Sequence, residues 1–146
     1  MSDDRFLDPT RGSFDAFKAL PRDEPIHMLN LLRFHENAQY PEGHECGQNG
    51  WSGTRAYAEY GKTSGPIFTR VGGTIVWRGK MQAMVIGPDD KQWDASFIAA
   101  YPNSGAFMEM ISDAEYKKVV VHRQAAVLTS RLIRFAPGDA GGNSFG

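Results

Sequence analysis

Apolar and polar positions along the chain follow the periods of strands and helices in turn. Residues 26–34 form an apolar run of strand length after Pro25, and such a run is typical of a strand buried on both faces. Residues 93–101 alternate instead, so that Phe97 and Tyr101 share one face of a strand. The predicted strands are residues 26–34, an interrupted strand at 74–77 and 83–86, residues 93–101 and residues 128–135.

Helical spacing of apolar residues predicts two main helical segments and a short N-terminal helix. Ser13 is a candidate N-cap of the short helix, which Pro21 ends. The first main helix opens at Thr54 and is expected to break at Gly65-Pro66, because proline removes a backbone donor from a helix interior. The second main segment consists of two pieces that are separated near Asp113. The predicted helices are residues 14–20, 54–64, 104–112 and 114–127.

The main elements occur in the order strand, helix, strand, strand, helix, strand, with an extra N-terminal helix. This is the order of the ferredoxin-like α+β fold, an antiparallel βαββαβ sheet with two main helices on one face. The other face needs a cover, and a second subunit is the economical one, so we expect a homodimer. We expect an N-terminal arm and short helix at 1–22, the ferredoxin-like domain at 23–137 and a flexible glycine-rich tail at 138–146.

Composition restricts the classes of partner. The 146 residues are 41% hydrophobic and 23% charged, which is ordinary for a single globular domain. A net charge of −1 gives no electrostatic reason to expect nucleic acid or an anionic membrane as a partner. The single cysteine, Cys46, excludes an intramolecular disulfide framework, and the first residues lack the apolar core of a signal peptide. We therefore expect a cytoplasmic protein.

Arg123 is the sharpest candidate for a functional residue. It falls on the same stripe as Tyr116 and three valines of the predicted helix 114–127, so it faces the core. A guanidinium in such a place needs an anionic or carbonyl partner, because an unpaired buried charge is very costly. Either it holds a carboxylate or carbonyl of a small ligand, or it makes a structural contact to a backbone carbonyl, to Asp94 or to Glu115.

Asn30 is the second candidate, in the middle of the apolar run 26–34. A buried amide must find partners, either a ligand or the backbone of neighbouring strands. His27 and Arg33 have the opposite strand parity, so the three side chains do not line one pocket. His122 points about 100° away from its neighbour on the helix and is expected at the rim of a pocket.

The long polar segment 35–53 is expected to be a functional or mobile loop. Its His44-Glu45-Cys46, with His35 and Glu42, superficially resembles a metal cluster but has no recognised ligand spacing. The glycines form neither a dinucleotide fingerprint nor a phosphate loop, and no Ser-His-Asp set can be argued. We expect no metal and no cofactor.

Met28–Leu32, Tyr57, Tyr60, Tyr116 and Arg123 occur in an order and spacing that resemble those of the family called Domain of Unknown Function 1330, whose members have the dimeric α+β barrel form of the ferredoxin-like fold. The resemblance spans about residues 24–136. Related sequences often carry a glutamate at the place of Ala100, so this chain lacks that carboxylate and any pairing of it with Arg123. The residues that carry the resemblance are Met28–Leu32, Tyr57, Tyr60, Gly72-Gly73, Trp93, Tyr101-Pro102, Tyr116 and Arg123.

The resemblance implies no defined activity and leaves two functions open. One is a homodimer that binds a small acidic or phenolic molecule between sheet and helices, through Asn30, Tyr101, Tyr116 and Arg123. Such a protein would be a candidate cofactor-independent oxygenase or isomerase. The other is a non-catalytic binding or structural dimer in which Asn30 and Arg123 only stabilise the core. Heme-degrading relatives place a histidine where this chain has Val120, and this difference argues against heme.

Overall fold

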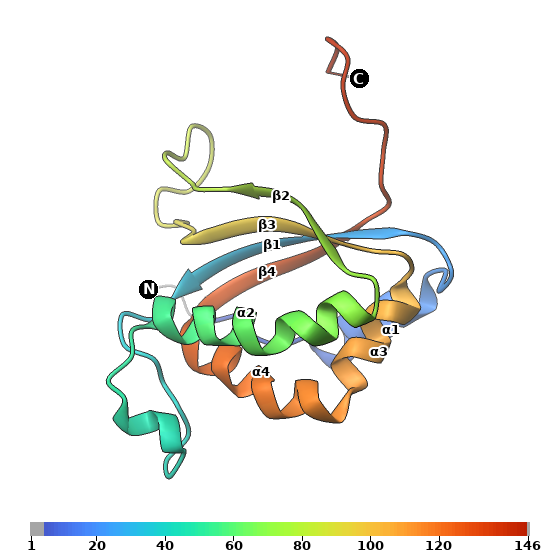
Figure 1. The fold of residues 1–146 in the computed structure, drawn as a ribbon. Helices are drawn as coiled ribbons and strands as arrows, with labels where there is room; N and C mark the ends of the chain where they lie inside the picture. The colour runs from blue at the N-terminus through green and yellow to red at the C-terminus, as the bar shows by residue number, and fades with distance from the viewer. Residues whose placement is uncertain (1–4, 146) are drawn as a thin grey trace.

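A computed structural model describes residues 5–145 and shows one four-stranded antiparallel sheet (Figure 1). The strands lie in the order β2-β3-β1-β4, so β1 is central and β2 and β4 are the edges. The helices lie together on one side of this sheet, which leaves the opposite face open. The predicted α+β architecture is therefore confirmed. The strands are β1 Ile26–Phe34, β2 Thr74–Gly79, β3 Ala95–Tyr101 and β4 Val127–Phe135.

The helices follow the predicted order with shifted ends. The short N-terminal helix begins at Arg11, because Thr10 and Ser13 form a reciprocal capping box in which Thr10, not Ser13, is the N-cap. Asp113 ends one helix and caps the next, and this produces the predicted break. None of the described helices is long and apolar enough to cross a membrane. The helices are α1 Arg11–Ala19, the 3₁₀ helix η1 Glu45–Gln48, α2 Gly53–Arg70, α3 Ser104–Ser112 and α4 Ala114–Ala126.

β1 has the predicted bounds and organises the core. Ile26, Met28 and Leu32 are almost completely buried on the face that carries the helices. Asn30 has the same parity and is paired across the sheet with Phe97 of β3 and Leu132 of β4, so it too faces the helices. The central strand therefore directs one polar side chain into the layer between sheet and helices.

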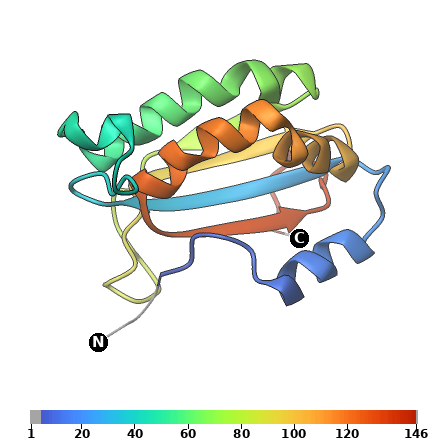
Figure 2. The ribbon, with the colours of Figure 1, turned by 90° about the horizontal axis from the view of Figure 1, so that it is seen from below.

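The predicted break at Gly65-Pro66 is wrong, because α2 continues through it to Arg70. Proline removes one helical hydrogen bond, but the last turn is held by tertiary packing. Ile67 and Val71 are buried in the core between α2 and the sheet, and their burial outweighs the local preference. Helix α2 consequently covers the sheet along its whole length (Figure 2).

The predicted strand at 83–86 is also wrong, because this segment belongs to a loop between β2 and β3. The last pair of that ladder joins Gly79 to Ser96, so residues 83–86 have no strand to pair with. Val85 and Ile86 are 89% and 93% exposed, which shows that β-propensity alone did not place them in the sheet. For the same reason β3 begins at Ala95 rather than at residue 93.

Candidate functional site

A cavity of about 920 Å³ lies between the helix-facing side of the sheet and the helices α1, α2 and α4. All four residues that the sequence singled out for ligand binding line it: Asn30, Tyr101, Tyr116 and Arg123. They come from three strands and helices far apart in the chain, namely β1, β3 and α4. Their role toward a ligand stays a prediction, but the fold brings them to one place.

Arg123 makes a carbonyl-capping contact. Its Nη1 donates to the carbonyl of Leu7 at 2.8 Å, and its Nη2 donates to the hydroxyl of Ser130 at 3.3 Å. The two acidic partners considered from the sequence are engaged elsewhere: Asp94 accepts from the backbone N–H of Phe34, and Glu115 accepts from a neighbouring lysine. Arg123 therefore fastens the N-terminal arm (residues 5–10) to the domain.

The N-terminal arm forms one wall of the cavity, which sequence reasoning did not foresee. The backbone of Phe6 makes two hydrogen bonds to β4. Its N–H donates to the hydroxyl of Thr129 at 3.0 Å, and its carbonyl accepts from the N–H of Ser130 at 2.8 Å. Helix α1 then lies beside the edge strand β4, where Arg134 donates to the carbonyls of Phe17 and Pro21 (Figure 2). The arm and α1 together close the β4 side of the cavity.

Four tyrosine rings reach the cavity, and two of their hydroxyls are joined. The hydroxyls of Tyr60 and Tyr116 lie 2.9 Å apart, and the ring of Tyr57 packs 5.3 Å from that of Tyr60. Burial raises the pKa of Tyr57, Tyr101 and Tyr116 well above the ordinary value, although Arg123 lowers the pKa of Tyr57 and Tyr116 in part. These phenols therefore stay protonated and are hydrogen-bond donors at neutral pH.

Asn30 and Tyr101 differ in how many of their hydrogen-bonding groups remain available to a ligand. The amide nitrogen of Asn30 donates to the carbonyl of Met28 at 3.1 Å, and no described residue donates to its amide oxygen. Tyr101 is only 6% exposed and its hydroxyl points to the sulfur of Met110 at 3.9 Å, with Phe107 against its ring. Asn30 is thus the better placed of the two for a polar ligand contact, and Tyr101 mainly completes the apolar wall.

The charges that line the cavity are strongly unbalanced. Among the described residues its lining contains five cationic side chains and one carboxylate, Asp8. No histidine is among these lining residues. The sequence reading had found only Arg123 of these cations. Arg78 and Arg134 reach the cavity through strand register, whereas Lys117 lies on α4 and Arg131 has the parity of the open face on the edge strand β4. The cationic lining residues are Arg78, Lys117, Arg123, Arg131 and Arg134.

The open face of the sheet carries the residues of opposite parity. His27 and Arg33 lie there, as the alternation predicted, and they do not line the cavity. Ala100 pairs with His27 and with Thr74, so it also faces away from the helices. A glutamate at that place would lie on the opposite side of the sheet from Arg123. Val120, by contrast, lines the cavity on α4.

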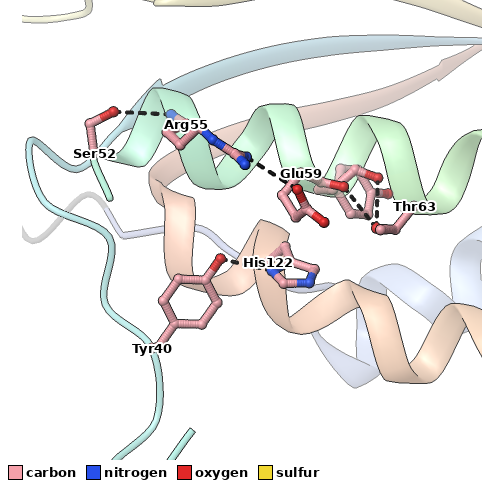
Figure 3. Close-up of polar contacts among 7 residues, drawn as sticks. Tyr40, Ser52, Arg55, Glu59, Thr63 and His122 are labelled. Atoms are coloured by element: carbon pink, nitrogen blue, oxygen red, sulfur yellow. Dashed lines mark hydrogen bonds and ion pairs between the residues drawn. The ribbon is translucent and has the colours of Figure 1, made fainter. Parts of the chain in front are cut away.

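A second cluster forms where the 35–53 segment meets α4 (Figure 3). The hydroxyl of Tyr40 lies 2.7 Å from Nδ1 of His122, and the ring of His44 stacks on Tyr40 at 5.0 Å. His122 is therefore half-buried under the segment rather than at the rim of the cavity. Desolvation raises the pKa of Tyr40 to about 12, so its hydroxyl is protonated, and the tautomer of His122 decides which of the two groups donates.

Helix α2 supplies the charged side of this cluster. Ser52 caps α2, and the guanidinium of Arg55 lies 4.0 Å from the ring centre of Trp51 while it pairs with Glu59 at 3.2 Å (Figure 3). His44 is committed to the backbone N–H of Cys46 through its Nδ1. Among residues 5–145 no group of three histidine, cysteine, aspartate or glutamate side chains is placed to hold a metal ion.

The cluster predicts a pH-dependent stability. Burial is the main cause that lowers the pKa of His122 below the 6.5 of an unfolded histidine. The unfolded chain therefore takes up this proton first as the pH falls, so the free energy of unfolding decreases below about pH 6.5. We expect His122→Gln to lose this component, so that the stability difference between wild type and variant shrinks from pH 8 to pH 5. Urea denaturation at several pH values measures it, and a difference that stays constant over this range would contradict the prediction.

The sheet order, the element order and the cavity define a ferredoxin-like α+β protein with an internal pocket. The chain belongs to the family described as Domain of unknown function (DUF1330), which its residues 49–134 match. This confirms the resemblance found from the sequence. Among curated proteins none matches the chain.

Solved structures support the same assignment. A protein of unknown function from Rhodopseudomonas palustris is 48% identical, with a TM-score of 0.85 over 93% of this chain and 99% of that one. A methylated form of the same protein is 49% identical, with a TM-score of 0.86 over 95% and 99%. The cofactor-independent oxygenase SnoaB from Streptomyces nogalater shares the fold at 14% identity, with a TM-score of 0.51 over 80% and 96%.

Proposed function

We propose that this protein is a homodimer that binds a small acidic or phenolic organic molecule in the cavity between sheet and helices. The charge imbalance of the lining carries this proposal, since five cations face one carboxylate in a space large enough for a small aromatic molecule. Tyrosine hydroxyls, including those of Tyr60 and Tyr116, add donors that favour an anionic oxygen. Phe68, Phe97 and Phe107 supply an apolar wall for a ring.

The chemistry available in the cavity favours binding over proton abstraction. A base would have to be Asp8 or a tyrosinate, and burial of the tyrosines opposes the latter by raising their pKa. A cofactor-independent oxygenase or isomerase remains consistent with the proposal if the ligand itself is the reacting anion. Cationic side chains of the lining would then stabilise a phenolate or enolate of the ligand.

The alternative, a dimer without a ligand, rests on the contacts of Arg123. Its bonds to Leu7 and Ser130 would stabilise the fold whether or not the cavity is ever occupied. These bonds explain why Arg123 is present, but they do not explain why the cavity is large and carries an excess of positive charge. The two functions are separated by a direct binding measurement.

The open face of the sheet supports the homodimer. Apolar side chains from all four strands lie on this face beside polar ones such as His27 and Arg33, and no helix or strand of the described chain covers them in Figure 1. Trp77, Ile133 and Phe135 are 49%, 41% and 48% exposed, although each belongs to a sheet. An apolar face of this kind marks an interaction surface, and a second copy related by a twofold axis would cover it with a matching face. Leu29, Leu31 and Ile98 lie on the same face.

We expect benzoate, salicylate and 4-hydroxybenzoate to stabilise the protein, and benzamide to leave it unchanged. A ligand that binds only the folded state at 100 times its Kd adds about 2.7 kcal/mol to the free energy of unfolding. Thermal unfolding with each compound, followed by calorimetric titration of those that stabilise, measures the effect. Equal stabilisation by benzamide, or none by any acid or phenol, would contradict the proposed ligand class.

A further inference from the structure

Arg78 owes its orientation to an irregularity in β2. In a regular strand the side chains of Ile75 and Arg78, three residues apart, would point to opposite faces. The register shifts between Ile75 and Trp77, so that Ile75 pairs with Ala99 and Arg78 pairs with Phe97, both on the helix-facing side. One extra residue in a strand re-aims the side chains that follow it, and such bulges occur at sheet edges and beside sites. The bulge thus turns Arg78 into the cavity.

The guanidinium of Arg78 keeps its donors free. Arg123 and Arg134, which line the same cavity, donate to backbone carbonyls of the N-terminal arm and of α1 with its following turn. The side chain of Arg78 makes no hydrogen bond and no ion pair with any residue of the described range 5–145. Its guanidinium carbon lies 5.9 Å from the ring centre of Phe97, and Arg78 is one of the charges that lower the pKa of Tyr57 in part.

The position of Arg78 suits the entrance of the cavity. It is exposed and sits near the end of the edge strand β2 (Figure 1), while its neighbours Phe97 and Tyr57 lie further inside. An entering anion would therefore meet this cation before the apolar wall. The planar guanidinium presents two parallel N–H groups, which match the two oxygens of a carboxylate better than a single phenol oxygen.

We propose that Arg78 is the residue that anchors the ligand, and that the ligand is an aromatic carboxylic acid whose carboxylate forms a bidentate pair with it. The ring of the acid then extends past Phe97 into the apolar part of the cavity, and the Tyr57 hydroxyl is within the same region as a further donor. This rests on the proposed function and narrows it from acidic or phenolic molecules to carboxylates. Arg123 in turn is assigned to holding the arm rather than to holding the ligand.

The test is calorimetric titration of benzoate into wild type, Arg78→Gln, Arg78→Lys and Lys117→Gln. A hydrogen-bonded charge pair is typically worth a factor of about 10 to 100 in affinity, so we expect Arg78→Gln to weaken benzoate binding by that factor. Arg78→Lys keeps the charge but not the planar pair of donors. Its affinity for benzoate should lie between those of wild type and Arg78→Gln. Lys117→Gln removes another cation from the same lining, so it should weaken benzoate binding, but by less than Arg78→Gln does, because it removes general charge and no bidentate pair.

The outcomes separate this inference from the proposed function. If wild type binds benzoate and Arg78→Gln binds it equally well, Arg78 is not the anchor, although the cavity still binds acids. If Lys117→Gln and Arg78→Gln weaken benzoate binding equally, the loss of affinity comes from the reduced positive charge of the cavity. The proposed bidentate pair between Arg78 and the carboxylate is then wrong. If wild type binds a phenol but no carboxylate, this inference fails and the proposed function stands; if wild type binds neither, both fail. Thermal unfolding of each variant verifies that the comparison concerns folded protein.

Discussion

Replacing Ile133 by lysine is expected to convert the proposed dimer into monomers. Ile133 lies on the open face of the sheet, paired with Leu29 of β1, and is 41% exposed in the single chain. If the face is covered by a second copy, twofold symmetry brings two ammonium groups into one apolar interface. Burying an unpaired charge costs several kcal/mol, so the dimer dissociation constant should rise at least about 100-fold. Analytical ultracentrifugation over a range of protein concentrations measures this change.

Gln124→Lys is the matched control for this substitution. It places the same side chain on the exposed surface of α4, on the opposite side of the sheet from the proposed interface. We expect the oligomeric state of this variant to equal that of wild type. A wild-type monomer would show the homodimer itself to be wrong, and an Ile133→Lys dimer would place the interface elsewhere.

Replacing Gly53 by alanine is expected to destabilise the fold. A Cβ atom at this position would lie 2.2 Å from the carbonyl oxygen of His35 and 2.9 Å from that of Ala126, and both are backbone atoms. The N–H of Gly53 also donates to the His35 carbonyl at 3.1 Å, so the start of α2 is held against β1 and α4 at this point. Overpacking of this kind costs about 1–3 kcal/mol, which urea denaturation detects.

Gly61→Ala in the same helix is the matched control. A Cβ atom there meets nothing within 4 Å, and alanine restricts the unfolded chain more than glycine does. We expect this variant to be more stable than wild type by about 0.4–1 kcal/mol. Equal effects of the two substitutions would mean that the close approach at Gly53 does not limit the packing of α2.

The local pattern of apolar and polar residues predicted secondary structure correctly where it followed a single strand or helix period. The apolar run of β1 predicted a strand, and the break expected near Asp113 is where the structure ends one helix and begins the next. Local pattern gave the wrong structure at Pro66 and at residues 83–86, because contacts with residues distant in sequence determine the secondary structure of both segments. Packing of Ile67 carries α2 past the proline, and the lack of a neighbouring strand leaves Val85 exposed.

The sequence by itself determined the order of elements, the face of β1 that holds Asn30 and the inward position of Arg123. These follow from the periods of strand and helix, which are properties of the chain alone. Only the tertiary structure decided which of these side chains share a cavity, since that depends on strand order and on where the N-terminal arm folds back. It also decided the direction of Arg78, because a bulge appears only when two strands pair.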